Sequence, residues 1–220
     1  MNDSEFDRAL IGAAFARLGR DGWRHLSLAG AAQDAGLSLA RARLRFPDRV
    51  VLLLRFGRYA DAPALTGAVA EAGSVRDRLF DMLMRRIDVL QAHRAGVLAL
   101  LRAVPFEPGL AVLLGTASVN SMRWLLEAAG APARGPLGLL RAKGLLAVWL
   151  WTVRAWQRDQ SEDLSATMAA LDAALARAEH AAGWLPHAPA PTQAPPEPSS
   201  PEPSSPDGPP AAETAPETPD

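Results

Sequence analysis

Apolar residues recur at steps of three and four along the first 20 residues, which is the period of a helix that packs on one face. These positions are Phe6, Leu10, Ile11, Phe15 and Leu18. Two glycines, Gly19 and Gly22, end the pattern. The chain is therefore expected to begin with one amphipathic helix.

Turn and capping residues then follow one another at short intervals. Ser27 can cap a short second helix that runs to about Asp34, and Ser38 can cap a third helix after a turn at Gly36. Pro47 ends the third helix. It can also open a fourth, expected over residues 48 to 61 before Pro63 interrupts it.

The helical period continues through the second half of the chain. Residues 74 to 77 resemble a capping box that opens a helix, and Pro105 and Pro108 mark a corner after short helices. Longer helices are expected over residues 109 to 129, 137 to 158 and 162 to 182, with Ser161 capping the last. No alternating apolar and polar pattern bounded by hairpin turns occurs, so the predicted fold class is all-α.

Composition divides the chain into three parts. Residues 186 to 220 hold 13 prolines and six acidic residues but no Lys or Arg, so this tail cannot bury enough apolar surface to fold. The expected domains are a helical head over residues 4 to 60, a helical second domain over 61 to 185, and the tail.

Charge separates in the same way. The whole chain carries 23 basic and 24 acidic residues, and without the tail's six acids the balance becomes positive by five. Residues 1 to 60 account for most of the excess, with ten arginines against six acids. A localised positive field favours a phosphate-facing surface at the N-terminal end.

Residues 26 to 54 follow the layout of a helix-turn-helix, in which the second helix enters the DNA major groove. On that helix Ala42 and Phe46 are expected to pack inward, and Arg41, Arg43 and Arg45 to project toward DNA. The alternative is that these arginines form a solvated helix face. Leu39 and Leu44 weigh against DNA, because at least one of them would be exposed on the same surface.

Other function classes find little support. With no cysteine there is neither a disulfide nor a thiolate metal site, and four scattered histidines lack metal-ligand spacing, so no metal or cofactor is expected. No phosphate-cradling glycine motif or nucleophile elbow indicates an enzyme. The acidic N-terminus does not resemble a signal peptide, and the longest apolar run falls short of a membrane span. A cytoplasmic protein is expected.

Residues 6 to 58 resemble the N-terminal domain of the TetR family of one-component regulators. The matching positions are Phe15, Gly22, Trp23, Leu26, Ser27, residues 29 to 32, residues 35 to 38, residues 46 to 48, Val51 and Leu52. The family's usual glycine, threonine and tyrosines on the recognition helix are replaced here by Ala40, Arg41, Arg43 and Arg45.

This resemblance implies a homodimer that binds double-stranded DNA. The last two long helices would form the dimer, and residues from about 62 onward would sense a ligand. The DNA-binding residues would be Ser27, Ser38, Arg41, Arg43, Arg45 and Arg49.

The C-terminal half is similar to a second family, the lipid-binding proteins of ubiquinone biosynthesis (Coq nine), which share the TetR fold. The similar positions are Trp124, Ala129, Gly130, Arg141, Thr152, Trp156, Asp159, Ser161, Asp163, Thr167, Leu171, Asp172 and Leu175. That family binds isoprenoid lipid and a partner enzyme in place of DNA. Its further C-terminal membrane helix has no counterpart before the proline-rich tail.

Aromatic and sulfur-containing residues gather in the second domain. A candidate pocket for an apolar effector consists of Met82, Met122, Trp124, Trp149 and Trp156. The alternative is that these side chains are ordinary core. The segment around Trp149 and Trp151 is apolar on nearly every side, which requires burial against its own domain and a symmetry mate.

Overall fold

The computed structural model describes residues 1–66 and 73–183, and within these ranges all regular structure is helical. This confirms the all-α prediction. The α-helices are α1 (Asp3–Asp21), α2 (Leu28–Asp34), α3 (Leu39–Arg45), α4 (Arg49–Leu65), α5 (Val75–Ala92), α6 (Arg94–Ala103), α7 (Pro108–Ala128), α8 (Gly135–Arg158) and α9 (Ser165–Gly183), with short 3₁₀ turns η1 (Trp23–His25) and η2 (Val104–Phe106).

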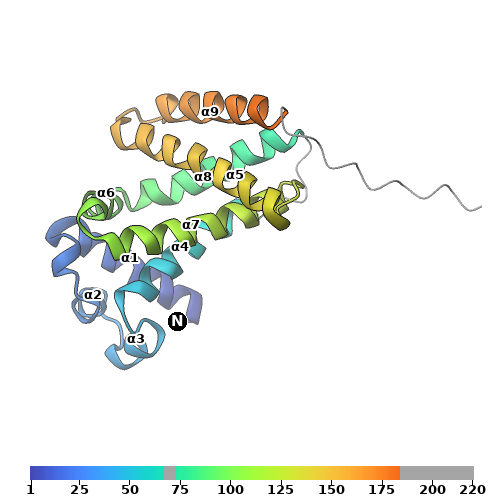
Figure 1. Cartoon of the computed structure of the whole chain (residues 1–220). Helices are drawn as coiled ribbons and strands as arrows, with labels where there is room; N and C mark the ends of the chain where they lie inside the picture. The colour runs from blue at the N-terminus through green and yellow to red at the C-terminus, as the bar shows by residue number, and fades with distance from the viewer. Residues whose placement is uncertain (67–72, 184–220) are drawn as a thin grey trace, which may run out of the picture. The chain divides into compact units, whose positions relative to one another are not determined.

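Residues 1–66 and 73–183 belong to one compact unit, in which α2 and α3 lie at one end and α8 and α9 at the other (Figure 1). Helices α1, α4 and α7 lie between these ends. The expected boundary at residues 60 and 61 falls inside α4, which is a continuous helix. The tail from residue 186 lies outside the described residues, so the expectation about it stays a prediction.

Side-chain caps fix where most of the N-terminal helices begin. Ser27, Ser38 and Asp48 each accept a hydrogen bond from a backbone N–H in the first turn of α2, α3 and α4, respectively. Ser74 and Asp77 form the predicted capping box at the start of α5. These elements follow from local sequence alone.

Two predicted helix ends are wrong. Helix α4 continues past Pro63 to Leu65. Pro63 has no N–H to donate to the carbonyl four residues earlier, and α4 ends two residues after it. Ser161 does not cap the last helix, because α9 begins at Ser165 and the carboxylate of Asp163 accepts the Ser165 N–H at 3.1 Å.

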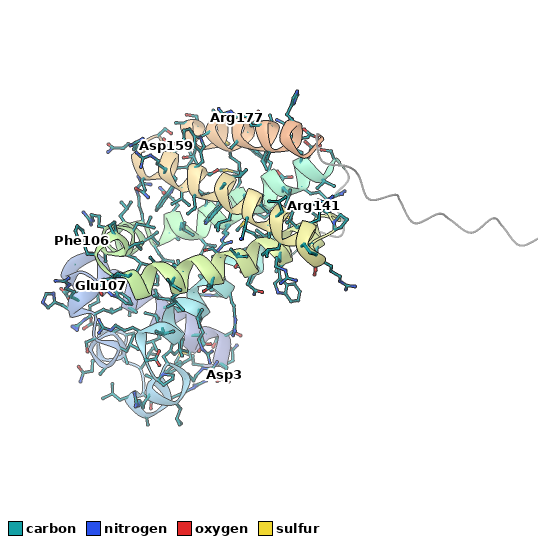
Figure 2. All side chains as sticks on the ribbon, in the orientation of Figure 1. Asp3, Phe106, Glu107, Arg141, Asp159 and Arg177 are labelled. Carbon is teal, nitrogen blue, oxygen red and sulfur yellow. The ribbon has the colours of Figure 1, made fainter. Side chains whose placement is uncertain are left out.

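Asp159 organises the corner between α8 and α9 (Figure 2). Its buried carboxylate accepts hydrogen bonds from the backbone N–H and the hydroxyl of Ser161, and from both groups of Thr167 at 2.8 and 2.7 Å. These donors hold the pKa of Asp159 well below its ordinary value. Several positions of the lipid-binding resemblance thus have a structural role.

We expect Asp159→Asn to lower the free energy of unfolding by about 1.5–3 kcal/mol at neutral pH. The amide replaces one acceptor oxygen by an NH₂ group, which would face the donors of Ser161 or Thr167. Because the folded-state pKa is depressed, this contribution is present above the ordinary value of 3.8 and is lost as the pH falls below it. Denaturation followed by circular dichroism from pH 7 to pH 3 checks both effects. The exposed Glu162→Gln serves as the control, and an equal pH dependence in Asp159→Asn and the wild type would contradict the assignment.

The joint between α1 and α6 depends on two glycines. A Cβ atom at Gly96 would lie against the backbone carbonyl of Phe15, and one at Gly19 would lie 2.9 Å from the Cβ of Ala95. Phe15 stacks on Phe56 of α4 with ring centroids 4.0 Å apart, and His93 packs against both rings. Close helix approach and aromatic packing therefore join the N-terminal helices to the rest of the unit.

Within residues 1–66 and 73–183, no single helix has the length and hydropathy of a membrane span. Residues 94–106 and 108–128 reach these criteria only as a pair, which is bent by 119°.

Candidate nucleic-acid interface

Helices α2 and α3 form the predicted helix-turn-helix. The turn passes through Gly36, whose φ of 63° lies in the left-handed region that favours glycine. The Ser27 hydroxyl accepts the Gly30 N–H at 3.1 Å, and the Ser38 hydroxyl accepts the Arg41 N–H at 3.4 Å. Both serines therefore cap helices, and their contact with DNA stays a prediction.

The inward side of α3 agrees with the helical pattern. Ala42 and Phe46 are 5% and 2% exposed, respectively, and belong to the core that also contains Phe6 of α1. This packing fixes the rotation of α3 about its axis. It therefore decides which side chains point outward.

The structure corrects the expected orientation of Arg41 and Arg45, which point along the flank of α3 toward α1. Asp3 pairs with both guanidinium groups, and the Asp7 carboxylate accepts two hydrogen bonds from Arg45 in a bidentate pair. Arg41 also lies over the ring of Phe6, 4.6 Å from its centroid. The pattern of α3 alone does not reveal this orientation, because the carboxylates lie on α1, 38 residues earlier in the sequence. Asp3 and Asp7 have the same four-residue spacing as Arg41 and Arg45.

These pairs have electrostatic consequences for both partners. The hydrogen bond from Arg41 lowers the pKa of Asp3, and the hydrogen bond to Asp7 raises the pKa of Arg45. Asp7 also pairs with Arg55 of α4 at 2.6 Å. Figure 2 shows Asp3 at the start of α1, at the same end of the unit as α3. Much of the positive charge on this flank is therefore neutralised within the protein.

Arg43 and Arg49 have different surroundings. Arg43 is exposed, and its Nη1 donates to the backbone carbonyl of Pro47. Arg49 donates to the carbonyl of Trp23 at 2.9 Å and lies over the Trp23 indole. Among the described residues neither guanidinium has a carboxylate partner. Arg43 is the α3 arginine best placed to meet an anion outside the protein.

The outward face of α3 is largely apolar, as Leu39 and Leu44 had indicated. Leu39 is 46% exposed and Leu44 is 84% exposed, with Ala40 and Arg43 between them on the same face. The exposed side chains of α3 are thus three apolar residues and Arg43, while the paired Arg41 and Arg45 are partly exposed on its flank.

The predicted effector residues lie in two different surroundings. Met82, Met122 and Trp156 are fully buried and Trp149 is 5% exposed, whereas Trp124 is 59% exposed and points away from that core. The Trp156 indole N–H donates to Gln91 at 2.9 Å. Two surface cavities of about 580 and 550 Å³ lie elsewhere, and none of the five residues lines either of them. Core packing accounts for four of the five side chains.

A buried ion pair, which the sequence analysis missed, lies beside these core residues. Arg86 of α5 is 6% exposed, and its Nη1 lies 3.2 Å from Oδ1 of Asp61 on α4. The Ser121 hydroxyl donates to the other oxygen of Asp61, and the guanidinium lies 4.6 Å from the Trp149 ring centroid. Burial lowers the pKa of Arg86, and the charge of Asp61 opposes this shift. Arg86 continues the apolar stripe of α5, a signal that the sequence did contain.

Comparison with known proteins agrees with this architecture. No family model matches the chain, and no curated protein matches it. Among solved structures, it is similar to a TetR transcriptional regulator from Nitrosomonas europaea ATCC 19718, with 21% identity, a TM-score of 0.66, and coverage of 80% of this chain and 99% of that one.

Two further solved structures have the same architecture. One is a putative TetR-family transcriptional regulator from Rhodococcus sp., with 21% identity, a TM-score of 0.57, and coverage of 80% of this chain and 98% of that one. The other is a putative TetR-family transcriptional regulator from Mesorhizobium loti MAFF303099, with 16% identity, a TM-score of 0.55, and coverage of 82% and 98%, respectively. The chain therefore has a TetR-like fold, as the resemblance of residues 6 to 58 predicted.

Proposed function

We propose that this protein is a DNA-binding transcriptional regulator. The observation that carries the proposal is the helix-turn-helix at one end of the unit, with α3 free of covering elements on its outward face (Figure 1). The solved structures of similar fold, all described as transcriptional regulators, support it. In this proposal α3 enters the major groove and Arg43 is its principal cation.

We further propose that the protein acts as a homodimer. One face of α8 exposes Leu139, Leu140, Leu150 and Trp151 to solvent, the last two being 58% and 52% exposed. Apolar surface of this kind is typical of a protein interface. A two-fold dimer through α8 and α9 would carry two α3 helices, which read half-sites about 34 Å apart.

Release from DNA by an apolar effector completes the proposed mechanism. An effector acts in this way if it binds better to a conformation in which the two α3 helices have the wrong spacing. In this proposal the effector site forms within the apolar core around Met82, Met122 and Trp149.

The second candidate is a lipid-binding accessory protein of ubiquinone biosynthesis on the same fold. Two observations favour it: Arg41 and Arg45 are paired within the protein, and Leu44 is exposed at the tip of the unit. This candidate predicts bound isoprenoid lipid and no selection of DNA sequences.

Selection of fragments from a genomic library by the purified full-length protein tests the proposal. We expect enrichment of a near-palindromic sequence, bound with an affinity that falls steeply as salt concentration rises. Arg43→Ala should weaken binding to that sequence by about tenfold to a hundredfold, the range for one lost guanidinium contact to a base. The exposed Arg123→Ala on α7 removes the same charge outside α3 and outside the proposed dimer helices, and it should have little effect.

The result that overturns the regulator proposal is the absence of any enriched sequence. Mass spectrometry of the same purified protein then decides on the second candidate, because copurified isoprenoid lipid would support it. If Arg43→Ala enriches the same sequence as strongly as the wild type, the protein binds DNA but does not recognise the sequence through Arg43 of α3.

A further inference from the structure

The outward face of α3 has an unusual composition for an element that meets a polyanion. Leu39, Ala40, Arg43 and Leu44 occupy one continuous arc of the helix surface, because residues three and four apart share a face. Leu44 is 84% exposed and contributes nothing to the core. The two remaining arginines of α3 lie on the flank, paired with α1.

A DNA major groove offers one apolar group, the methyl group of thymine, alongside the hydrogen-bonding edges of the bases. Apolar side chains on a recognition helix contact that methyl group, and an arginine donates to O6 and N7 of guanine. Ala40 is small enough to let the helix approach the bases between the two leucines. The face of α3 therefore matches a groove that presents thymine methyl groups beside a guanine.

We propose that Leu39 and Leu44 read thymine methyl groups, and that Arg43 reads a guanine between or beside them. This inference rests on the proposed DNA-binding function and adds the kind of half-site that the protein selects. Arg41 and Arg45 act as positioning residues, because their pairs with Asp3 and Asp7 hold α3 in the rotation that turns the leucines outward.

Charge favours duplex DNA as the occupant of this face. Residues 1 to 60 carry ten arginines and six acidic residues, and Arg43 has no carboxylate partner among the described residues. The exposed apolar side chains are few and are interrupted by this cation. A groove lined by phosphates at its edges and by methyl groups at its floor complements both features.

Deoxyuridine provides a direct test because it differs from thymidine only by the missing methyl group. Each thymidine of the best selected duplex is replaced in turn, and binding is measured by fluorescence anisotropy with the full-length protein. We expect about fourfold weaker binding at one or two thymidines in each half-site, which corresponds to the loss of one buried methyl group. Other thymidines should tolerate the replacement.

Variant proteins assign each methyl group to a side chain. Leu44→Ala should bind the thymidine duplex about threefold to tenfold more weakly and should lose the deoxyuridine effect at one position, while keeping it elsewhere. Val112→Ala, an exposed apolar residue on α7, should retain the wild-type pattern. Leu44 lies outside the core, so circular dichroism should show unchanged folding.

The outcomes separate this inference from the proposed function. If a sequence is selected but every deoxyuridine duplex binds as tightly as the thymidine duplex, DNA binding stands and methyl reading is wrong. If no sequence is selected, both fail together. If the protein binds isoprenoid-containing vesicles and Leu44→Ala abolishes this binding, the outward face of α3 binds lipid and not DNA.

Discussion

Asp61→Ala is expected to lower the free energy of unfolding by about 3–5 kcal/mol, because it leaves the guanidinium of Arg86 buried without a counter-charge. Asp61 lies 3.2 Å from Arg86 and also accepts a hydrogen bond from Ser121. Within the described residues no hydrogen-bond partner satisfies Nε or Nη1 of Arg86. The Asp61 carboxylate is therefore the main group that offsets the cost of burying this cation.

Urea denaturation followed by circular dichroism measures the effect. The control Asp88→Ala removes an exposed carboxylate from α5 and should change the unfolding free energy by no more than about 0.5 kcal/mol. The double variant Asp61→Ala/Arg86→Met removes both charges and should recover most of the loss. Equal losses in the single and double variants would show that the ion pair is not the cause.

Gly96→Ala is expected to destabilise the protein by about 1–3 kcal/mol through overpacking of the joint between α1 and α6. The added methyl group would meet the carbonyl oxygen and carbon of Phe15, which belong to the backbone of α1. Backbone atoms cannot move aside as a flexible side chain would. The two helices must therefore separate and weaken the packing around Phe15.

Gly115→Ala provides the matched control for this prediction. Gly115 lies inside α7, and a Cβ atom there would have no neighbouring atom within 4 Å. Alanine favours a helix interior over glycine by about 0.8–1.0 kcal/mol, so this variant should be stabilised slightly. The account of the joint is wrong if the thermal midpoint of Gly96→Ala equals or exceeds that of the wild type.

Local signals allowed most of the fold to be predicted from the sequence. Ser27, Ser38 and Ser74 cap helices where the pattern placed them, since capping depends on a side chain and the backbone three residues further on. Two predicted ends were wrong: α4 runs two residues past Pro63, and the Ser161 hydroxyl donates to Asp159 while α9 begins at Ser165. The bonds from Thr167 and Ser161 to Asp159 fix the second corner instead.

The orientation of the α3 arginines could not be derived from α3 alone. Their partners lie on α1, and pairing depends on how the two helices cross. One signal was available: Asp3 and Asp7 are spaced four residues apart, as are Arg41 and Arg45. Matched spacing of opposite charges on neighbouring helices indicates a ladder of ion pairs, and it would have left Arg43 as the outward cation.

The buried pair of Asp61 and Arg86 left a comparable signal. Arg86 stands among Leu79, Met82, Leu83 and Leu90 on the apolar stripe of α5, where a charged residue needs a buried partner. The sequence does not identify that partner, because α4 and α5 are packed together only in the folded unit.

The central claim is that two α3 helices enter the major groove, and methylation interference by dimethyl sulfate on a selected duplex tests it most directly. Methylation of guanine at N7 blocks the major groove, whereas methylation of adenine at N3 blocks the minor groove. We predict that methylation of a guanine abolishes binding at two positions about 10 base pairs apart, one in each half-site. Methylation at these two positions should no longer change the binding of Arg43→Ala. Interference confined to adenines, or none at all, would contradict the account.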